Sequence, residues 1–326
     1  MRPFSYQRVS DAAAAVRAQG AFLAGGTTLL DLMKLDVMQP HALVDINDLS
    51  GEFGAIDYGS QGLRLGALVH MNIAARHPDI VQNYPVISQS LLLAASAQLR
   101  NMASLGGNVL QRTRCSYFRD TSWSRCNKRN PGSGCAALEG VNRKHAVLGT
   151  SPNCIATYPG DFAQALVALD AVVETAGPQG ARRIAFADLH VPPGDDPSRE
   201  NTLRPGELIT FLVVPALPFA RRSLYLKIRD RQSYEFALTS AAVALDLNGD
   251  TVREARIALG GVATRPWRAR EAEASLRGKP LNQATAQAAA QAAFSSAVTH
   301  GGNDFKPELG RRTLVRALLE AGALRV

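Results

Sequence analysis

The sequence has little of several features that mark common classes of protein. It has four cysteines in 326 residues, no apolar run long enough to span a bilayer, and no apolar segment followed by a cleavage site near its start. The three spaced glycines of a dinucleotide-binding Rossmann turn are also missing. These absences argue against a membrane-spanning chain, a disulfide-stapled secreted domain and a nicotinamide-binding domain. We expect a chain made in the cytoplasm without a signal of its own.

Acidic residues are fewer than basic ones, and the formal net charge is +8. The excess is concentrated between residues 100 and 144, where nine Lys or Arg residues stand against Asp120 and Glu139. Such a balance suggests an anionic group or partner. With 46% hydrophobic residues the chain has enough apolar content for packed cores, and its length predicts two domains.

Hydrophobic periodicity predicts an α+β protein with a domain boundary near residue 220. The first part should contain a strand, glycine turn and helix in "AFLAGGTTLLDLMKL", a strand at 41–46, a hairpin at 55–69, a helix at 86–99, a helix and two strands after residue 161, and a strand at 207–215. The second part should contain strands with an Asn-Gly-Asp turn, followed by helices at 268–277, 282–298 and 307–321.

Two paired-glycine turns are candidates for binding an extended phosphate-containing ligand. One is Gly25–Gly26–Thr27–Thr28 and the other is Ser104–Leu105–Gly106–Gly107–Asn108. Glycine lets backbone N–H groups approach a phosphate, and the start of a helix favours the negative charge. A single turn of this kind is more often an ordinary threonine-capped turn. Two of them would suit the two ends of a dinucleotide.

All four cysteines, Cys115, Cys126, Cys135 and Cys154, fall in one 40-residue stretch with the spacing C-x10-C-x8-C-x18-C. Structural zinc usually takes closely paired cysteines, whereas an iron–sulfur cluster can take four thiolates from a long loop. A [4Fe–4S] core with four thiolates carries a charge of about −2. Five nearby cations could offset it: Arg112, Arg114, Arg125, Lys128 and Arg129. The pattern favours a cluster and leaves zinc and incidental thiols open.

Two other functions are compatible with parts of the sequence. A basic loop with Tyr117, Phe118 and Trp123 beside arginines is typical of a nucleic-acid-binding module with a zinc site, but it gives the glycine turns no role. A stand-alone flavin oxidase would need a base facing the substrate. The sequence identifies none, since His145 lies in the cysteine loop and the other histidines are scattered.

Five segments give the chain a family resemblance. In order they are "LAGGTTLLDLMK", "QLRNMASLGGNVLQRTRC", "YPGDFAQALVALDAVVE", "LRPGELI" and "ALGGVATRPWRA". Together they resemble the FAD-binding subunit of the xanthine oxidase family of molybdenum hydroxylases. The segment "CNKRNPGSGCAALEG" is most similar to the FAD subunit of bacterial periplasmic aldehyde oxidoreductase. A similar insertion occurs in 4-hydroxybenzoyl-CoA reductase.

The resemblance implies an α+β fold of two domains. Residues 1–220 would form a two-subdomain FAD-binding domain of the PCMH type, similar to vanillyl-alcohol oxidase. Its subdomains would be about 1–57 and 58–220, with a cysteine-bearing insertion at about 111–156. Residues 221–326 would form a C-terminal domain like that of the CO dehydrogenase flavoprotein, in which a β-sheet packs on a helical bundle.

The resemblance also implies the residues that hold FAD and a [4Fe–4S] cluster. The pyrophosphate would lie on Ala24, Gly25, Gly26, Thr27, Thr28 and Leu29, and a second wall would consist of Ser104, Gly106, Gly107 and Asn108. Asp161 would bind the cofactor through its carboxylate, Ile209 through its backbone, and Lys227 would lie near the isoalloxazine. The cluster ligands would be Cys115, Cys126, Cys135 and Cys154.

Two local readings accompany these assignments. Gly160 stands where the family more often has serine, which removes a hydroxyl donor but leaves the neighbouring carboxylate of Asp161. Taken alone, Asp161 could also serve as the N-cap of the helix that follows.

The implied function is that of an electron-transfer subunit in a heterotrimeric, molybdenum-dependent aldehyde oxidoreductase. A large partner would carry the molybdenum cofactor and a small partner two [2Fe–2S] clusters. Electrons would pass through FAD to oxygen, a quinone or a ferredoxin-like protein, with no catalytic side chain, no nucleic acid and no membrane span. Alternatives within the family are xanthine dehydrogenase and an aryl-CoA reductase. Export with a signal-bearing partner would place the assembled enzyme in the periplasm.

Overall fold

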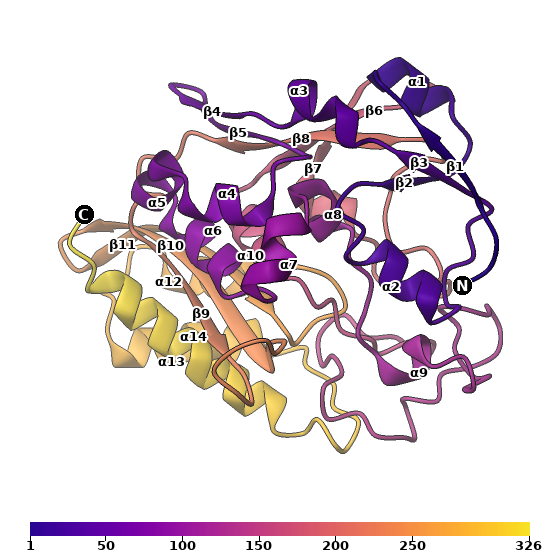
Figure 1. The fold of residues 1–326 in the computed structure, drawn as a ribbon. Helices are drawn as coiled ribbons and strands as arrows, with labels where there is room; N and C mark the ends of the chain where they lie inside the picture. The colour runs from indigo at the N-terminus through magenta and orange to yellow at the C-terminus, as the bar shows by residue number, and fades with distance from the viewer.

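The computed structural model describes residues 1–326, which fold around three β-sheets (Figure 1). The first sheet is parallel, with strand order β1-β3-β2. Its elements and the short helices beside it are β1 (Ser5–Arg8), α1 (Ala12–Arg17), β2 (Ala21–Leu23), α2 (Leu29–Lys34), β3 (Ala42–Asp45), η1 (Asn47–Leu49) and α3 (Ser50–Phe53). The predicted strand, glycine turn and helix at the start of the chain are therefore confirmed.

The second sheet is antiparallel and has the strand order β4-β5-β8-β6-β7. Its strands are β4 (Ile56–Gly59), β5 (Gly62–Gly66), β6 (Val172–Ala176), β7 (Arg182–Ala185) and β8 (Leu208–Pro215). The helices before and between these strands are α4 (Met71–Arg76), α5 (Pro78–Asn83), α6 (Pro85–Leu92), α7 (Ala97–Met102), α8 (Leu105–Val109), α10 (Phe162–Ala168) and α11 (Phe186–Leu189). All seven residues of α10 are buried, so this helix lies in the core of the molecule.

Two details of this region differ from the sequence-based prediction. The single helix expected at 86–99 is wrong, because the chain leaves helical geometry at Ala95, whose φ is 50°, and restarts with Ser96 capping α7. The second glycine turn is the first turn of a short helix, α8, and Ser104 caps it by accepting a hydrogen bond from the N–H of Gly107 at 3.2 Å. The first difference involves a positive φ at a residue other than glycine and the second a side-chain cap, and hydrophobic periodicity registers neither.

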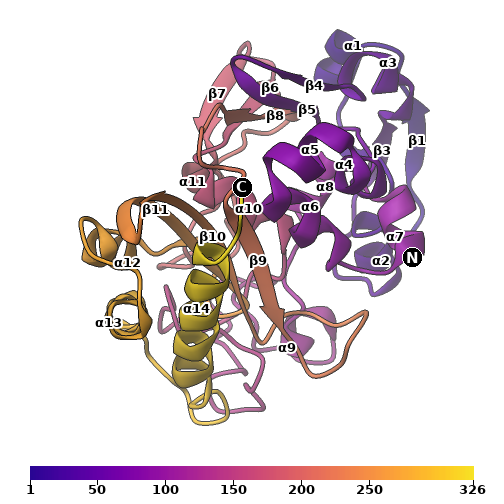
Figure 2. The ribbon, with the colours of Figure 1, turned by 90° about the vertical axis from the view of Figure 1, so that its left-hand side faces the viewer.

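The third sheet, β12-β11-β10-β9, is antiparallel and has helices on both faces (Figure 2). Helices α6 and α10 of the first part contact it, as do the C-terminal helices. The elements are β9 (Ser223–Ile228), β10 (Thr239–Asn248), β11 (Thr251–Gly260), β12 (Trp267–Arg268), α12 (Arg270–Leu276), α13 (Gln283–Ala293) and α14 (Lys306–Gly322). The expected turn at Gly249 and the three expected helices are present, and the α+β fold class is confirmed.

The cysteine insertion, residues 111–156, contains a single short helix, α9 (Ser116–Arg119), and is otherwise irregular. It lies below α2 in Figure 1, and its end is held to the third sheet by backbone hydrogen bonds from Val147 and Leu148 to the carbonyl of Val262 at 2.8 and 3.0 Å. The insertion therefore contacts both domains.

Of the helices in the structure, none has both the length and the apolar character needed to cross a bilayer.

Candidate cofactor sites

A cleft of about 610 Å³ separates the first sheet from the second. Its walls come from the glycine loop at 24–29, the start of α8, the start of β8 and the loop at 198–203, with apolar side chains such as Phe22 and Ile46 among them. The two predicted glycine segments, far apart in sequence, thus line one cavity. Its mixture of backbone polar groups and apolar side chains is typical of a cofactor site.

The glycine loop presents an uninterrupted series of free backbone donors. The N–H groups of residues 25–29 have no hydrogen-bond acceptor within the protein, and the first helical bond of α2 runs from the N–H of Leu30 to the carbonyl of Gly26 at 3.0 Å. Thr28, at the N-cap position, makes no capping bond with its side chain. Gly26 has a φ of 71°, which glycine adopts without strain. Successive unpaired N–H groups at the edge of a cleft form a binding site for an anion such as a pyrophosphate.

Three glycines are needed here for different reasons. A Cβ on Gly25 would stand 1.8 Å from the carbonyl oxygen of Met102, so only glycine allows the loop to pack against the end of α7. A Cβ on Gly106 would stand 2.9 Å from that of Ala67. At Gly107 a Cβ would meet only the Ser104 hydroxyl, at 3.0 Å, and otherwise open space. Gly25 and Gly106 therefore close the walls, whereas Gly107 leaves room for a ligand.

The start of β8 is fixed by an ion pair that the sequence analysis missed. Glu207 lies at the cleft and accepts hydrogen bonds from the Arg182 guanidinium at 2.6 Å and from the Thr175 hydroxyl at 2.5 Å. Burial opposes its ionisation, but these bonds and the N–H of Arg204 outweigh burial and lower the pKa of Glu207 to about 2. The anchored turn places Ile209 at the cleft wall. The motif "LRPGELI" contained this glutamate, but no pattern pointed to Arg182.

Asp161 and Lys227 lie outside the set of residues that line the cleft. The Asp161 carboxylate accepts hydrogen bonds from the Lys227 ammonium at 2.8 Å and from the Tyr225 hydroxyl at 2.7 Å, and Lys227 also donates to the Leu93 carbonyl at 3.0 Å. Burial raises the pKa of Asp161, against the opposing charge of Lys227. The pair joins α10 to β9 across the domain boundary. Asp161 stands at the N-cap position of α10, as its place in the sequence allowed, but its side chain makes no capping bond.

Asn108 also lies outside the lining residues, next to Gly107. Its side-chain N–H contacts the Met71 sulfur at 3.4 Å, and its buried carbonyl oxygen has no hydrogen-bond partner in the protein. A buried polar atom without a partner is unusual, so this oxygen is a candidate acceptor for a ligand group.

The departure from the family pattern at Gly160 has a steric cause. A Cβ there would stand 2.6 Å from the ring of Tyr158, whose hydroxyl donates to the Val109 carbonyl at 3.0 Å. Tyr158 is 7% exposed and fills the space that a serine would need. The glycine and the tyrosine are therefore a matched pair.

The four cysteines converge, and none forms a disulfide. Burial, with the neighbouring Cys126 and Cys135, raises the pKa of Cys115 to about 12. A hydrogen bond from the Cys154 thiol lowers the pKa of Cys135 to about 6 and raises that of Cys154. Cys126 and Cys135 are also paired through an antiparallel bridge. Each cysteine thus has another beside it.

The donors at this site are four cysteine thiols, none of them in a disulfide. Four thiolates, each bound to a different iron, are the ligands that a [4Fe–4S] cluster requires. Backbone N–H groups also reach the sulfurs, as that of Ala156 does to Cys154 at 3.4 Å. Such bonds stabilise the thiolate form.

Most of the basic side chains predicted to offset the charge of a cluster have partners within the protein. Arg114 pairs with Asp31 at 3.2 Å, and Arg125 pairs with Glu139 at 3.1 Å. Arg129 donates to the carbonyls of residues 117, 118, 120 and 123 and closes the loop around α9. These cations therefore help to hold the insertion in place, and of their partners only Asp31 lies far away in sequence.

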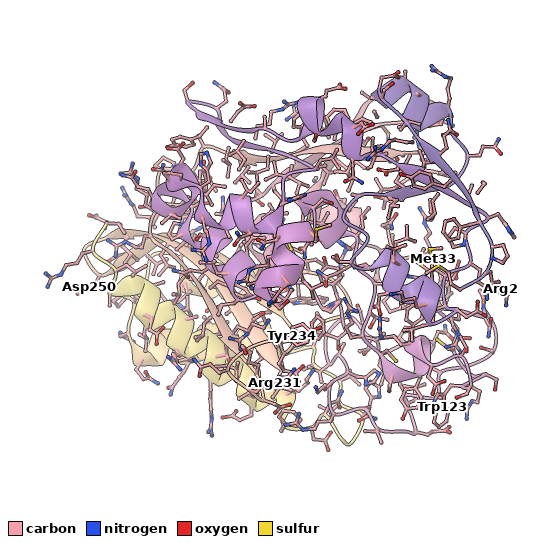
Figure 3. All side chains as sticks on the ribbon, viewed as in Figure 1. Arg2, Met33, Trp123, Arg231, Tyr234 and Asp250 are labelled. Carbon is pink, nitrogen blue, oxygen red and sulfur yellow. The ribbon has the colours of Figure 1, made fainter.

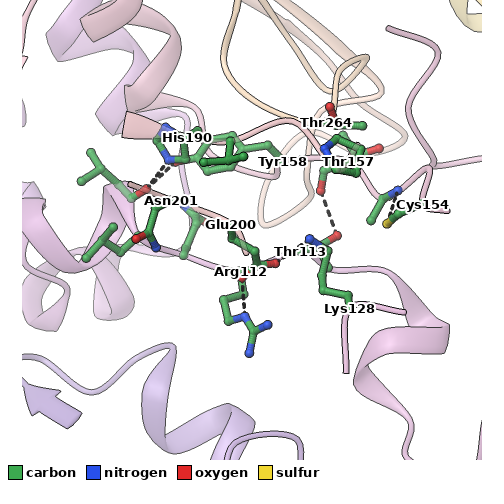
Figure 4. A pocket seen from close by; sticks show the side chains of 16 residues that line it. Arg112, Thr113, Lys128, Cys154, Thr157, Tyr158, His190, Glu200, Asn201 and Thr264 are labelled. Atoms are coloured by element: carbon green, nitrogen blue, oxygen red, sulfur yellow. Dashed lines mark hydrogen bonds and ion pairs between the residues drawn. The ribbon is translucent and has the colours of Figure 1, made fainter. Parts of the chain in front are cut away.

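Arg112 and Lys128 connect the insertion to the cleft through one carboxylate. Glu200, at the cleft wall, pairs with Arg112 at 2.5 Å and with Lys128 at 2.8 Å (Figure 4). Burial opposes ionisation of Glu200, but the two cations outweigh it and lower its pKa. Lys128 also acts on Cys154, where its charge opposes the rise in the thiol pKa. This triad therefore links the cleft to the cysteines.

The aromatic residues of the insertion do not form a stacking surface. Tyr117 and Phe118 are 6% and 1% exposed, and Trp123 alone of the three reaches the surface, at the edge of the molecule in Figure 3. The arginines beside them are paired with carboxylates and carbonyls. The nucleic-acid-binding alternative is therefore not supported, because it requires exposed aromatic rings beside free cations.

Comparison with known proteins covers the whole chain. Residues 1–217 match the family described as the FAD binding domain in molybdopterin dehydrogenase, and residues 224–321 match the CO dehydrogenase flavoprotein C-terminal domain. The aldehyde oxidoreductase FAD-binding subunit PaoB of Escherichia coli is 48% identical, with 99% of each chain covered. The carbon monoxide dehydrogenase medium chain of Afipia carboxidovorans is 26% identical over 97% of this chain and 93% of its own length.

A solved structure agrees with the fold. Carbon monoxide dehydrogenase from Hydrogenophaga pseudoflava superposes with a TM-score of 0.76 at 26% identity, covering 99% of this chain and 98% of that one. The likeness extends over both domains, including the sheet of β9 to β12.

Proposed function

Because the chain belongs to the FAD-binding subunits of the molybdenum hydroxylases, and is of the aldehyde oxidoreductase type, we propose that it is the electron-output subunit of a heterotrimer. As the medium chain of such an enzyme it has a small and a large partner subunit. The observation that carries the proposal is the series of unpaired N–H groups at residues 25–29, which faces the start of α8 across one cleft.

The chain's own residues bind and orient the flavin. The loop at 25–29 would hold the pyrophosphate through backbone N–H groups, and Gly107 leaves space on the opposite wall. The Glu207–Arg182 pair keeps the backbone around Ile209 at the cleft. FAD supplies the redox chemistry, since it exchanges electrons with one-electron and two-electron partners. No side chain of this subunit needs to act as acid or base.

The insertion would hold a [4Fe–4S] cluster on Cys115, Cys126, Cys135 and Cys154. This part of the proposal is supported by the convergence of the thiols and by the backbone N–H of Ala156, which reaches the sulfur of Cys154. Bound iron would favour the thiolate form and reverse the effect of burial on the pKa of Cys115. The Arg112–Glu200–Lys128 triad would lie between the cluster and the flavin and contact both sites.

The remaining parts of the proposal concern the assembled enzyme. The large partner would oxidise the aldehyde at its molybdenum cofactor, and the small partner would pass electrons through two [2Fe–2S] clusters to FAD. Oxygen, a quinone or a ferredoxin-like protein would then accept them. We place the complex in the periplasm, carried there by a signal-bearing partner. Cell fractionation with an antibody to this chain tests that location, and exclusively cytoplasmic enzyme would contradict it.

The electron route can be tested in the purified heterotrimer under anaerobic conditions. Addition of an aldehyde should bleach the flavin and the [2Fe–2S] absorbance together, and acceptor reduction should follow. A heterotrimer with Gly107→Val should still reduce its [2Fe–2S] clusters with aldehyde but should reduce acceptor poorly, because the flavin is missing. Undiminished acceptor reduction without bound flavin would show that electrons leave elsewhere.

A further inference from the structure

A histidine that the proposed function does not use contacts one of the cysteines. His145 Nε2 lies 3.1 Å from Cys115 Sγ, and the histidine is only 5% exposed. The other ring nitrogen, Nδ1, is buried and has no hydrogen-bond partner in the protein. The geometry thus gives the ring one polar contact, the Cys115 sulfur.

The proton of a neutral imidazole can occupy either nitrogen. A Cys115 thiolate bound to a cluster can only accept, so in that state the 3.1 Å contact from Nε2 to Sγ requires Nε2 to carry the proton. Nδ1 is then the unprotonated nitrogen, and its burial without a donor is the cost of this arrangement. The opposite tautomer would place two acceptors against each other.

The backbone at the histidine and at the residue after it is held by the C-terminal domain. Lys306, the first residue of α14, is fully buried and donates to the His145 carbonyl at 2.9 Å and to the Gly261 carbonyl at 2.6 Å. Asn303 donates to the Ala146 carbonyl at 3.0 Å. Lys306 has no carboxylate partner within salt-bridge distance. A buried ammonium held only by carbonyls is costly, which suggests that its position serves a purpose.

We propose that His145 is a positioning residue of the cysteine site, donating an Nε2–H hydrogen bond to the Cys115 thiolate. Lys306 holds the segment so that the C-terminal domain sets the direction of this bond. The inference rests on the cluster in the proposed function. Hydrogen bonds to ligand sulfur spread its negative charge, favour the reduced form and raise the reduction potential of an iron–sulfur cluster. His145 and Lys306 would therefore make this cluster easier to reduce.

The test uses the anaerobically purified chain and the variants His145→Ala, His145→Gln and Lys306→Met. Iron, acid-labile sulfide and FAD are counted first, and the midpoint potential of the cluster is then measured by redox titration followed by electron paramagnetic resonance. We expect full iron and FAD in each variant. The potential should be lower in His145→Ala, less so in Lys306→Met, and closest to wild type in His145→Gln, whose amide N–H can still donate. His41→Ala, at an exposed histidine, is the control and should leave the potential unchanged.

The iron count separates two kinds of failure. A wild-type chain without iron would refute the cluster, and with it the inference. If the wild-type chain holds a full cluster and His145→Ala has the same potential, the role of His145 is refuted but the cluster assignment stands. Loss of iron in His145→Ala, with full iron in Cys115→Ser, would also overturn it, because His145 would then be a ligand. If His145→Ala does not fold, the potentials of His145→Gln and Lys306→Met decide, and no shift in Lys306→Met would remove its positioning role.

Discussion

The glycine-lined cleft and the cysteine insertion adjoin each other but are built in different ways. The cleft offers a ligand backbone N–H groups that the protein leaves unpaired, whereas most charged side chains of the insertion are already paired, chiefly with carboxylates elsewhere in the protein. Glu200 is where the two meet. The cleft is thus specified by short local segments, and the insertion by contacts between residues far apart. Substitutions should therefore affect the two regions separately.

The largest effect should follow removal of a cysteine. Cys126→Ser or Cys135→Ser should abolish the broad absorbance of the cluster, because four thiolates are needed to hold it. FAD should remain, since its contacts come from the loop at 25–29 and from α8 and β8. Iron and flavin counted in one preparation check both statements. Flavin lost in parallel with iron would show that the regions are one unit.

Gly107→Val should act in the opposite direction, on flavin and not on iron. The added side chain enters the cleft at a position where the fold leaves open space, so the fold tolerates it while the cofactor meets it. We expect FAD affinity to fall by about tenfold or more, which corresponds to about 1.4 kcal/mol. The control is Gly59→Val, at an exposed position outside the cleft where an added Cβ would meet no atom within 4 Å. Equal FAD affinity in the valine variant and the wild type would mean that the second wall is misassigned.

Glu207→Gln should lower stability and make it less sensitive to acid. The substitution removes a carboxylate held by Arg182, and hydrogen bonds to charged groups contribute about 1.5 to 3 kcal/mol. The folded pKa of Glu207, about 2, lies below its ordinary value of 4.5, so its contribution is full above pH 4.5 and is lost as pH falls towards 2. Urea unfolding at pH 7 and pH 3 measures this. The control is Glu320→Gln, in the exposed Arg316–Glu320 ion pair, which should change the free energy of unfolding little at either pH. An equal loss of stability at pH 7 and pH 3 in Glu207→Gln would contradict the predicted link between the pKa of Glu207 and stability.

Arg125→Ala should have the smallest effect. Arg125 and Glu139 are 54% and 76% exposed in their side chains, so their ion pair should contribute less than about 1 kcal/mol. The variant should retain its iron and its cluster potential, because this arginine is paired with a carboxylate. Thermal unfolding and the redox titration check the two expectations. A clear drop in potential would restore Arg125 as a counter-charge to the cluster.

Features with local sequence signals, such as the cleft loop, could be predicted from the sequence, whereas features that depend on distant residues could not. The strand, glycine turn and helix at 21–34 were predictable because their signals are local, and so were the C-terminal helices. The break at Ala95 was not, because a positive φ in alanine is imposed by its surroundings. The partners of Arg114 and Lys128 were equally out of reach, since Asp31 and Glu200 lie 83 and 72 residues away along the chain. Spacing located the cysteines, but only the fold placed His145 beside Cys115.

The account as a whole depends on both cofactors residing in this one chain. The most direct measurement counts flavin, iron, acid-labile sulfide and zinc in a single anaerobic preparation of the purified subunit. We predict about one flavin, released by acid, with about four irons, about four sulfides and no zinc, as a [4Fe–4S] centre requires. One zinc per chain without labile sulfide, or protein that never contains flavin, would contradict it.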